Sequence, residues 1–117
     1  MLAELVVDLE AVRANVRALR ALVTPAQVAA VVKANAYGHG LIAVAGAIEA
    51  AVDRLCVYEL SEAVALRDAG IAAPIHVLGP IPAQDLEIAH AAGVQVTLWD
   101  RGTYAAQLAM GNTAKSK

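Results

Sequence analysis

The chain has few aromatic residues and almost no cysteine. Phenylalanine is absent from its 117 residues, and aromatic residues make up only 3% of them. The single cysteine, Cys56, cannot form a disulfide within the chain, and its neighbours Leu55 and Val57 predict a buried, inert thiol. We therefore predict a cytosolic (cytoplasmic) protein whose core is built from aliphatic side chains and alanine, without disulfides.

The charge and hydropathy patterns lack the features of two classes of binding protein. The formal net charge is -2 and the arginines are dispersed, so the basic stripe typical of nucleic-acid binding is missing. No apolar run reaches the roughly 20 residues that a membrane span needs. The sequence thus predicts neither a nucleic-acid partner nor a membrane association.

Metal ligation finds no support in the sequence either. Neither a Cys-x-x-Cys nor a His-Glu-x-x-His spacing occurs. His76 lies in an expected strand and His90 in an expected helix, and neither forms a plausible ligand cluster with Cys56. We predict no metal site.

Apolar residues recur with alternating strand and helix periods along the chain. Hydrophobic residues make up 59% of the sequence, enough for the core of one compact domain. Asp8 is a predicted N-cap for a helix that ends near Thr24, because the proline after Thr24 disfavours helical geometry there. The predicted strands span residues 5–7, 27–32, 54–57, 75–78 and 94–98. The predicted helices span residues 9–24, 41–51, 62–69 with Ser61 as N-cap, 83–92, and 100–108 with Asp100 opening the helix.

This regular alternation predicts parallel strands joined by right-handed crossovers. Two architectures fit such a pattern. A doubly wound sheet is complete at this length, whereas a (β/α)8 barrel takes about 250 residues and would be only half built. The element pattern alone favours the doubly wound sheet.

The segment from residue 28 to residue 40 carries the most chemical information. Residues 28–32 are all apolar and predict a strand buried on both faces. Lys33 follows directly, so a primary amine lies at the strand end, where it is able to attack an aldehyde and form a Schiff base. Gly38 and Gly40 allow the backbone to turn tightly before the next helix. For an isolated lysine in such a place, the alternative is a solvated amine without a chemical role.

This segment resembles a known family. Residues 33–40, Lys-Ala-Asn-Ala-Tyr-Gly-His-Gly, are similar in full to the pyridoxal-phosphate attachment segment of alanine racemases. Further segments resemble the same family in the same order: Val7-Asp8-Leu9 with Asn15, Glu62-Ala63 with Leu66-Arg67 and Gly70, and Pro74-Ile75-His76-Val77-Leu78-Gly79. The family's enzymes are longer, with a barrel of about 250 residues and a β-rich C-terminal domain.

The resemblance changes the expected architecture. It implies an α/β fold in which residues 1–117 form the N-terminal portion, about half, of a (β/α)8 TIM-type barrel with parallel strands. Lys33 would then lie at the carboxyl end of the first barrel strand, at the rim where barrel active sites gather. The family's C-terminal β domain has no counterpart in these residues. We expect the chain to be a partial record or a truncated product of a longer protein.

The resemblance also implies a cofactor and its site. Lys33 would be the Schiff-base lysine of pyridoxal 5'-phosphate and one of two catalytic bases, while the family's second base, a tyrosine of the partner subunit, is not in this chain. Tyr37 matches the tyrosine whose hydroxyl binds the cofactor phosphate. Val31 and Leu78 match apolar positions that line the cofactor pocket, although a core role is a close alternative for both. His39 is expected only to cap the following helix.

The implied activity is that of a pyridoxal-phosphate-dependent isomerase. Such an enzyme acts as a homodimer and interconverts L-alanine and D-alanine, supplying D-alanine for cell-wall peptidoglycan. Two alternatives stay open: a related broad-specificity amino-acid racemase of the same fold, and an inactive truncated half-barrel. We expect residues 1–117 alone to lack racemase activity, because they offer at most one of the two bases.

Overall fold

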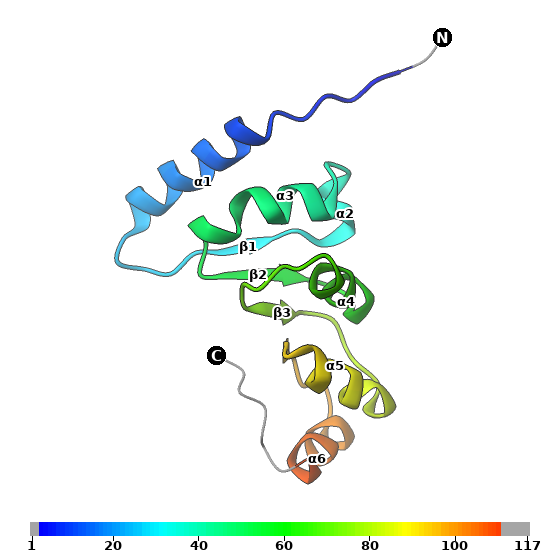
Figure 1. The fold of residues 1–117 in the computed structure, drawn as a ribbon. Coiled ribbons are helices and arrows are strands. Elements are labelled where there is room, and N and C mark those ends of the chain that lie inside the picture. The colour runs from blue at the N-terminus through cyan, green and yellow to red at the C-terminus, as the bar shows by residue number, and fades with distance from the viewer. Residues whose placement is uncertain (1–2, 111–117) are drawn as a thin grey trace.

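The computed structural model describes residues 3–110, which alternate between helices and strands (Figure 1). The helical elements are α1 (Leu9–Val23), α2 (Lys33–Tyr37), α3 (Leu41–Ile48), α4 (Leu60–Asp68), α5 (Leu86–Ala92) and α6 (Arg101–Ala109), with short 3-10 turns η1 (Glu49–Ala51) and η2 (Ala83–Asp85). The strands are β1 (Ala29–Val31), β2 (Arg54–Val57), β3 (Ile75–Val77) and β4 (Gln95–Val96). Within residues 3–110, no helix combines the length and the apolar character that crossing a membrane requires.

The four strands form one parallel sheet in the order β1-β2-β3-β4. Strands that follow one another in sequence are therefore neighbours in the sheet. Figure 1 shows this order for β1, β2 and β3. A doubly wound sheet reverses its direction at a switch point, whereas a barrel adds each strand beside the preceding one. The parallel α/β arrangement is confirmed, and its strand order favours the barrel.

The hydrophobic core lies between one face of the sheet and the helices. Leu55, Val57, Ile75 and Val77 of the two central strands are at most 1% exposed. They belong to a cluster with helix residues that include Ala45, Ile48, Leu66, Leu86 and Ala89. Because successive strand residues point to opposite faces, the residues between them, Cys56 and His76, lie on the other face.

One strand prediction near the N-terminus is wrong, and another is confirmed only in part. Residues 5–7 are not a strand, and Leu5 and Val6 are 69% and 78% exposed, since residues 3–110 provide no strand that pairs with them. The strand predicted over residues 27–32 is shortened to β1 and is not buried on both faces, because Val31 is 41% exposed. β1 is an edge strand of the sheet, and its apolar sequence did not reveal that position.

The helix boundaries follow local capping chemistry. Asp8 accepts hydrogen bonds from the backbone N–H groups of Glu10 and Ala11, and Asp100 accepts one from Thr103, so both predicted N-caps are confirmed. The prediction of Ser61 as N-cap is wrong. Helix α4 begins at Leu60 with Glu59 as its N-cap, because the Glu62 side chain reaches back to the Glu59 N–H group.

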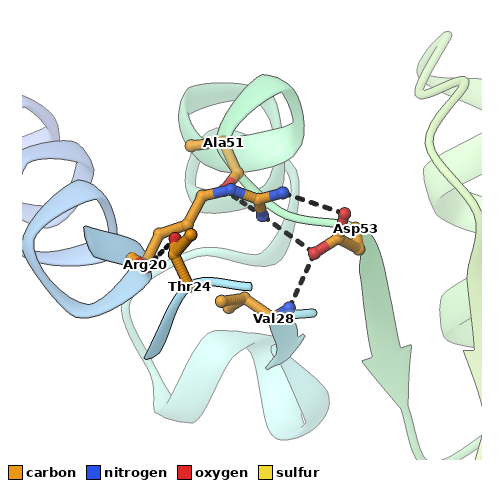
Figure 2. A network of polar contacts seen from close by, with 5 residues as sticks. All are labelled: Arg20, Thr24, Val28, Ala51 and Asp53. Carbon is orange, nitrogen blue, oxygen red and sulfur yellow. Dashed lines mark hydrogen bonds and ion pairs between the residues drawn. The ribbon is translucent and has the colours of Figure 1, made fainter. Parts of the chain in front are cut away.

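An acidic side chain holds the amino ends of β1 and β2 together. Asp53 precedes β2, and its carboxylate accepts the Val28 backbone N–H at 2.7 Å, just before β1 (Figure 2). The same carboxylate receives two hydrogen bonds from Arg20 of α1, at 2.8 and 3.0 Å, while Arg20 also donates to the Ala51 carbonyl. Asp53 thus joins α1 and the first two strands at one edge of the sheet.

We predict that Asp53→Asn lowers the free energy of unfolding at neutral pH. The hydrogen bonds from Arg20, followed by that from the Val28 N–H, hold the pKa of Asp53 below its usual value. A carboxyl group whose pKa is lower in the folded state stabilises the fold above its unfolded pKa, and that stabilisation is lost as the pH falls through the folded pKa.

Urea unfolding at several pH values measures this effect, with Asp68→Asn, at an exposed position of α4, as the charge-matched control. The difference between the parent chain and Asp53→Asn should be greatest near pH 7 and should shrink below the ordinary aspartate pKa of about 3.9. An equal stability loss at all pH values would contradict the proposed carboxylate role.

Candidate functional site at the carboxyl edge of the sheet

Lys33 lies where strand β1 ends. The Val32 N–H donates to the Cys56 carbonyl at 2.8 Å, which extends the β1–β2 hydrogen bonding one residue past β1, and Lys33 follows. The predicted position of this lysine at the carboxyl end of a strand is therefore observed. It is also the only lysine in the first 114 residues of the sequence.

The backbone after Lys33 turns in a left-handed sense. The φ angles of Ala34, Asn35, Ala36 and Tyr37 lie between +54° and +57°. For residues with a side chain this conformation costs about 1–2 kcal/mol each. The sequence had assigned the turn to Gly38 and Gly40, whereas the structure begins it four residues before the first glycine, so α2 stores strain next to the lysine.

Hydrogen bonds around Asn35 hold this turn. Its carbonyl accepts the N–H groups of Gly38 at 3.1 Å and Gly40 at 2.9 Å, and its side-chain Oδ1 accepts the Leu41 N–H at 2.7 Å. Asn35 therefore binds the first residue of α3, a role that the sequence had assigned to His39. The His39 ring instead contacts the Ala36 carbonyl through Nδ1 at 3.0 Å.

The Lys33 side chain borders a cleft of about 440 Å³ between the ends of β1 and β2. Its other lining residues are Ala34, Tyr58, Glu59 and Glu62. The Lys33 Nζ lies 5.9 Å from the centre of the Tyr58 ring, at the outer limit of a cation–π contact. Within residues 3–110, Lys33 takes part in no ion pair, so its amine remains available to a ligand in the cleft.

Tyr58 is a site residue that the sequence reasoning missed. It directly follows β2. Val31 of β1 pairs with Cys56 of β2, so two residues further on Lys33 lies opposite Tyr58. Val57 of β2 pairs with Val77 of β3, so Tyr58 also lies opposite Leu78. Strand register is a long-range property, so the only local signal was the position of Tyr58 immediately after an apolar strand. Its aromatic ring forms the wall of the cleft beside the lysine.

The other predicted site residues are spread along the same edge. Tyr37, 60% exposed, and Val31 line a second cavity of about 270 Å³ between β1, α1 and α3, distinct from the cleft that Lys33 borders. Leu78 is half-buried at the end of β3, where its N–H donates to the Val57 carbonyl. The structure thus brings Lys33, Tyr37, Val31 and Leu78 to one edge without joining them in one pocket.

The remaining candidate side chains lie away from this cleft. Cys56 is buried, as predicted, and burial raises the pKa of its thiol. The His76 ring contacts the Thr97 hydroxyl at 2.9 Å, and burial together with the charge of Arg54 lowers its pKa. Among residues 3–110, no cluster of three or more His, Cys, Asp or Glu side chains is arranged to hold a metal ion.

These features define a parallel α/β domain of barrel type that presents a lysine at the carboxyl rim of its first strand. A family model described as "Alanine racemase, N-terminal domain" matches residues 7–116. The chain belongs to this family.

Relatives of known name agree with this assignment. The chain is 50% identical over 95 residues to alanine racemase from Symbiobacterium thermophilum, covering 80% of this chain and 25% of that protein. It is 51% identical over 84 residues to alanine racemase from Streptococcus equi subsp. zooepidemicus, covering 71% and 23% respectively. The chain spans about a quarter of the length of these curated relatives.

Solved structures show the same likeness. Alanine racemase from Bacillus anthracis with bound L-Ala-P superposes with a TM-score of 0.81 at 39% identity, over 89% of this chain and 28% of that one. The enzyme from E. faecalis gives a TM-score of 0.81 at 30% identity, over 88% and 28%. The expected architecture, the N-terminal part of a TIM-type barrel, is confirmed.

We predict that Gly79→Ala destabilises the carboxyl edge. A Cβ atom at residue 79 would lie 2.6 Å from the Tyr58 carbonyl oxygen and 2.8 Å from its ring, so the backbone itself would have to move. Overpacking of this kind costs about 1–3 kcal/mol. Thermal or urea unfolding measures the loss.

Gly46→Ala in α3 is the matched control, because a Cβ there meets nothing within 4 Å. This helix-interior change should stabilise the protein by about 0.5–1 kcal/mol. Equal stabilities of the two variants would show that a Cβ atom at residue 79 is accommodated without the predicted overpacking against Tyr58.

Proposed function

We propose that this chain supplies the cofactor-attachment part of an alanine racemase that depends on pyridoxal 5'-phosphate. The observation that carries the proposal is Lys33, an amine outside any ion pair of residues 3–110, held at the carboxyl rim by a strained turn whose sequence resembles the family's attachment segment. The substrate class is supported by the Bacillus anthracis relative, which is described with bound L-Ala-P.

The residues present fit an aldehyde cofactor at this edge. The Lys33 Nζ borders an open cleft with an aromatic wall, and an aldehyde reacts with a primary amine of this kind. Tyr37, at the end of the left-handed turn, has an exposed side chain whose hydroxyl is able to donate to a phosphate. Val31 and Leu78 are assigned as apolar contacts of the cofactor from the family resemblance, because neither lines the cleft that Lys33 borders.

In the proposed racemisation, the cofactor would activate the substrate and side chains of the protein would move the proton. Pyridoxal 5'-phosphate, when bound, draws electrons from the α-carbon of an amino acid and so acidifies its α-hydrogen. Lys33 would attach the cofactor, be released when the amino group of the substrate takes its place, and as a free amine serve as a base at the α-carbon on one face of the substrate. Inversion needs a second base on the opposite face, which we assign to a tyrosine of the partner subunit in a homodimer.

We place the complete enzyme in the cytoplasm, where D-alanine made from L-alanine would enter cell-wall peptidoglycan. The single buried thiol of Cys56 is compatible with a reducing compartment. Substrate breadth is decided by assaying a panel of amino acids, in which alanine should react fastest.

We predict that pyridoxal 5'-phosphate attaches to Lys33 in the protein that carries this chain. Borohydride reduces the C=N bond that forms when an amine condenses with an aldehyde and loses water, which makes the link permanent. Peptide mapping by mass spectrometry should then locate the cofactor on Lys33, and Lys33→Ala should abolish both labelling and racemisation.

The two other lysines of the sequence, Lys115 and Lys117, provide the control. Replacing both with arginine should leave the labelling of Lys33 unchanged. Label found mainly on either of them would refute the assignment of Lys33.

We also predict that Tyr37→Phe weakens cofactor binding without abolishing catalysis. A hydrogen bond to a charged group contributes about 1.5–3 kcal/mol, so the cofactor dissociation constant should rise at least tenfold. Fluorescence titration with the cofactor measures this, with Tyr104→Phe, an exposed tyrosine on α6, as the control. Complete loss of turnover with normal cofactor affinity would instead make Tyr37 a catalytic base.

A further inference from the structure

Glu62, in the first turn of α4, binds three backbone N–H groups with one carboxylate. Its Oε1 accepts the N–H groups of Tyr58 at 3.0 Å and Glu59 at 2.9 Å. Its Oε2 accepts the N–H of Ala34 at 2.8 Å, from a residue 28 positions earlier in the chain. One side chain therefore links the turn after β1 to the loop after β2.

The two oxygens serve different purposes. The Oε1 contact with Glu59 closes the N-terminus of α4, a local arrangement found in many helices. The Oε2 contact with Ala34 contributes nothing to that cap. It crosses to the neighbouring strand end and fixes the backbone at the lysine.

The Ala34 N–H belongs to the peptide group that joins Lys33 to Ala34. Because a peptide group is planar, a hydrogen bond to its N–H restrains both the ψ angle of Lys33 and the φ angle of Ala34. Ala34 is the first left-handed residue, with φ +54° and ψ +49°, a conformation that is unfavourable for a residue with a Cβ atom. Holding this plane therefore sets the direction in which the Lys33 side chain leaves the backbone.

The carboxylate does this without forming an ion pair with the Lys33 amine. Glu62 borders the same cleft as Lys33, yet its oxygens are engaged by N–H groups and no ion pair joins the two side chains. The arrangement leaves the amine available while restraining the backbone that carries it.

We propose that Glu62 is a positioning residue for Lys33: through the Ala34 N–H it sets the backbone of the cofactor-attachment turn so that the lysine amine faces its aldehyde ligand. This inference rests on the proposed function, in which Lys33 is the attachment residue. It adds Glu62, from the next βα unit, to the residues that hold the backbone next to Lys33.

Glu62→Gln separates the two roles of the carboxylate. The glutamine Oε1 keeps accepting the N–H groups of Tyr58 and Glu59, whereas its NH₂ group faces the Ala34 N–H, so that two donors oppose each other. Glu62→Asp retains the negative charge but shortens the side chain by one methylene, so it loses the reach to Ala34. Asp68→Asn on the exposed part of the same helix changes the charge alone and is the matched control.

The experiment uses the protein that carries this chain, with pyridoxal 5'-phosphate as the probe. Cofactor affinity and the rate of borohydride-trapped labelling at Lys33 are measured for the parent and the three variants, together with the melting temperature of each apoprotein. We expect Glu62→Gln and Glu62→Asp to weaken affinity about tenfold and to slow labelling in proportion. Asp68→Asn should behave like the parent. All the apoproteins should melt well above 25 °C, so that unfolding does not explain the differences in cofactor affinity and labelling rate measured at that temperature.

The possible outcomes distinguish this inference from the function on which it rests. If the parent protein is not labelled at Lys33, the proposed function fails. If the parent is labelled and both Glu62 variants match Asp68→Asn, the positioning role alone is overturned. A loss in Glu62→Gln with normal behaviour of Glu62→Asp also overturns it, because charge and not reach would then be responsible.

Discussion

The parallel pairing of β1 with β2 is the constraint on which the rest of the structure depends. A carboxylate holds each end of this pair: Asp53 binds the Val28 N–H at the amino ends, and Glu62 binds the Ala34 N–H at the carboxyl ends. Both are charged acceptors for backbone donors, which makes these contacts stronger than neutral hydrogen bonds. The Asp53 contact lies just before β1 begins, and the Glu62 contact lies just after β1 ends, where Lys33 leaves the sheet.

The left-handed turn after Lys33 lowers the stability of the fold and in return holds the backbone next to Lys33 in one conformation. Four successive residues with a side chain and positive φ together cost several kcal/mol, at about 1–2 kcal/mol each. Neighbouring elements offset this cost, since Asn35 binds the start of α3 and Glu62 binds from α4. Backbone strain of this kind persists only where several surrounding contacts hold it in place. Here the strained turn directly follows Lys33, the residue that we propose attaches the cofactor.

Sequence patterns predicted the features that depend on residues close together in the chain, such as the order of helices and strands and the helix N-caps. Hydrophobic periodicity gave the alternation of elements, and Asp8 was identified as a cap because its partners lie two and three residues away. Strand register and contacts across strands escaped prediction. Tyr58 faces Lys33 only through the β1–β2 register, and the residues joined by Glu62 Oε2 and the Ala34 N–H are 28 positions apart. The left-handed turn was missed because nothing in the alanines themselves favours it.

Amide hydrogen exchange at Ala34 shows whether a carboxylate from the neighbouring βα unit restrains the backbone at the lysine. We expect this amide, although it lies in an exposed turn, to exchange far more slowly than in an unfolded peptide. Glu62→Gln should remove the protection at Ala34 while leaving the Leu55 amide in the core protected. Exchange at Ala34 as fast as in an unfolded peptide, or protection that is unchanged in Glu62→Gln, would contradict this restraint.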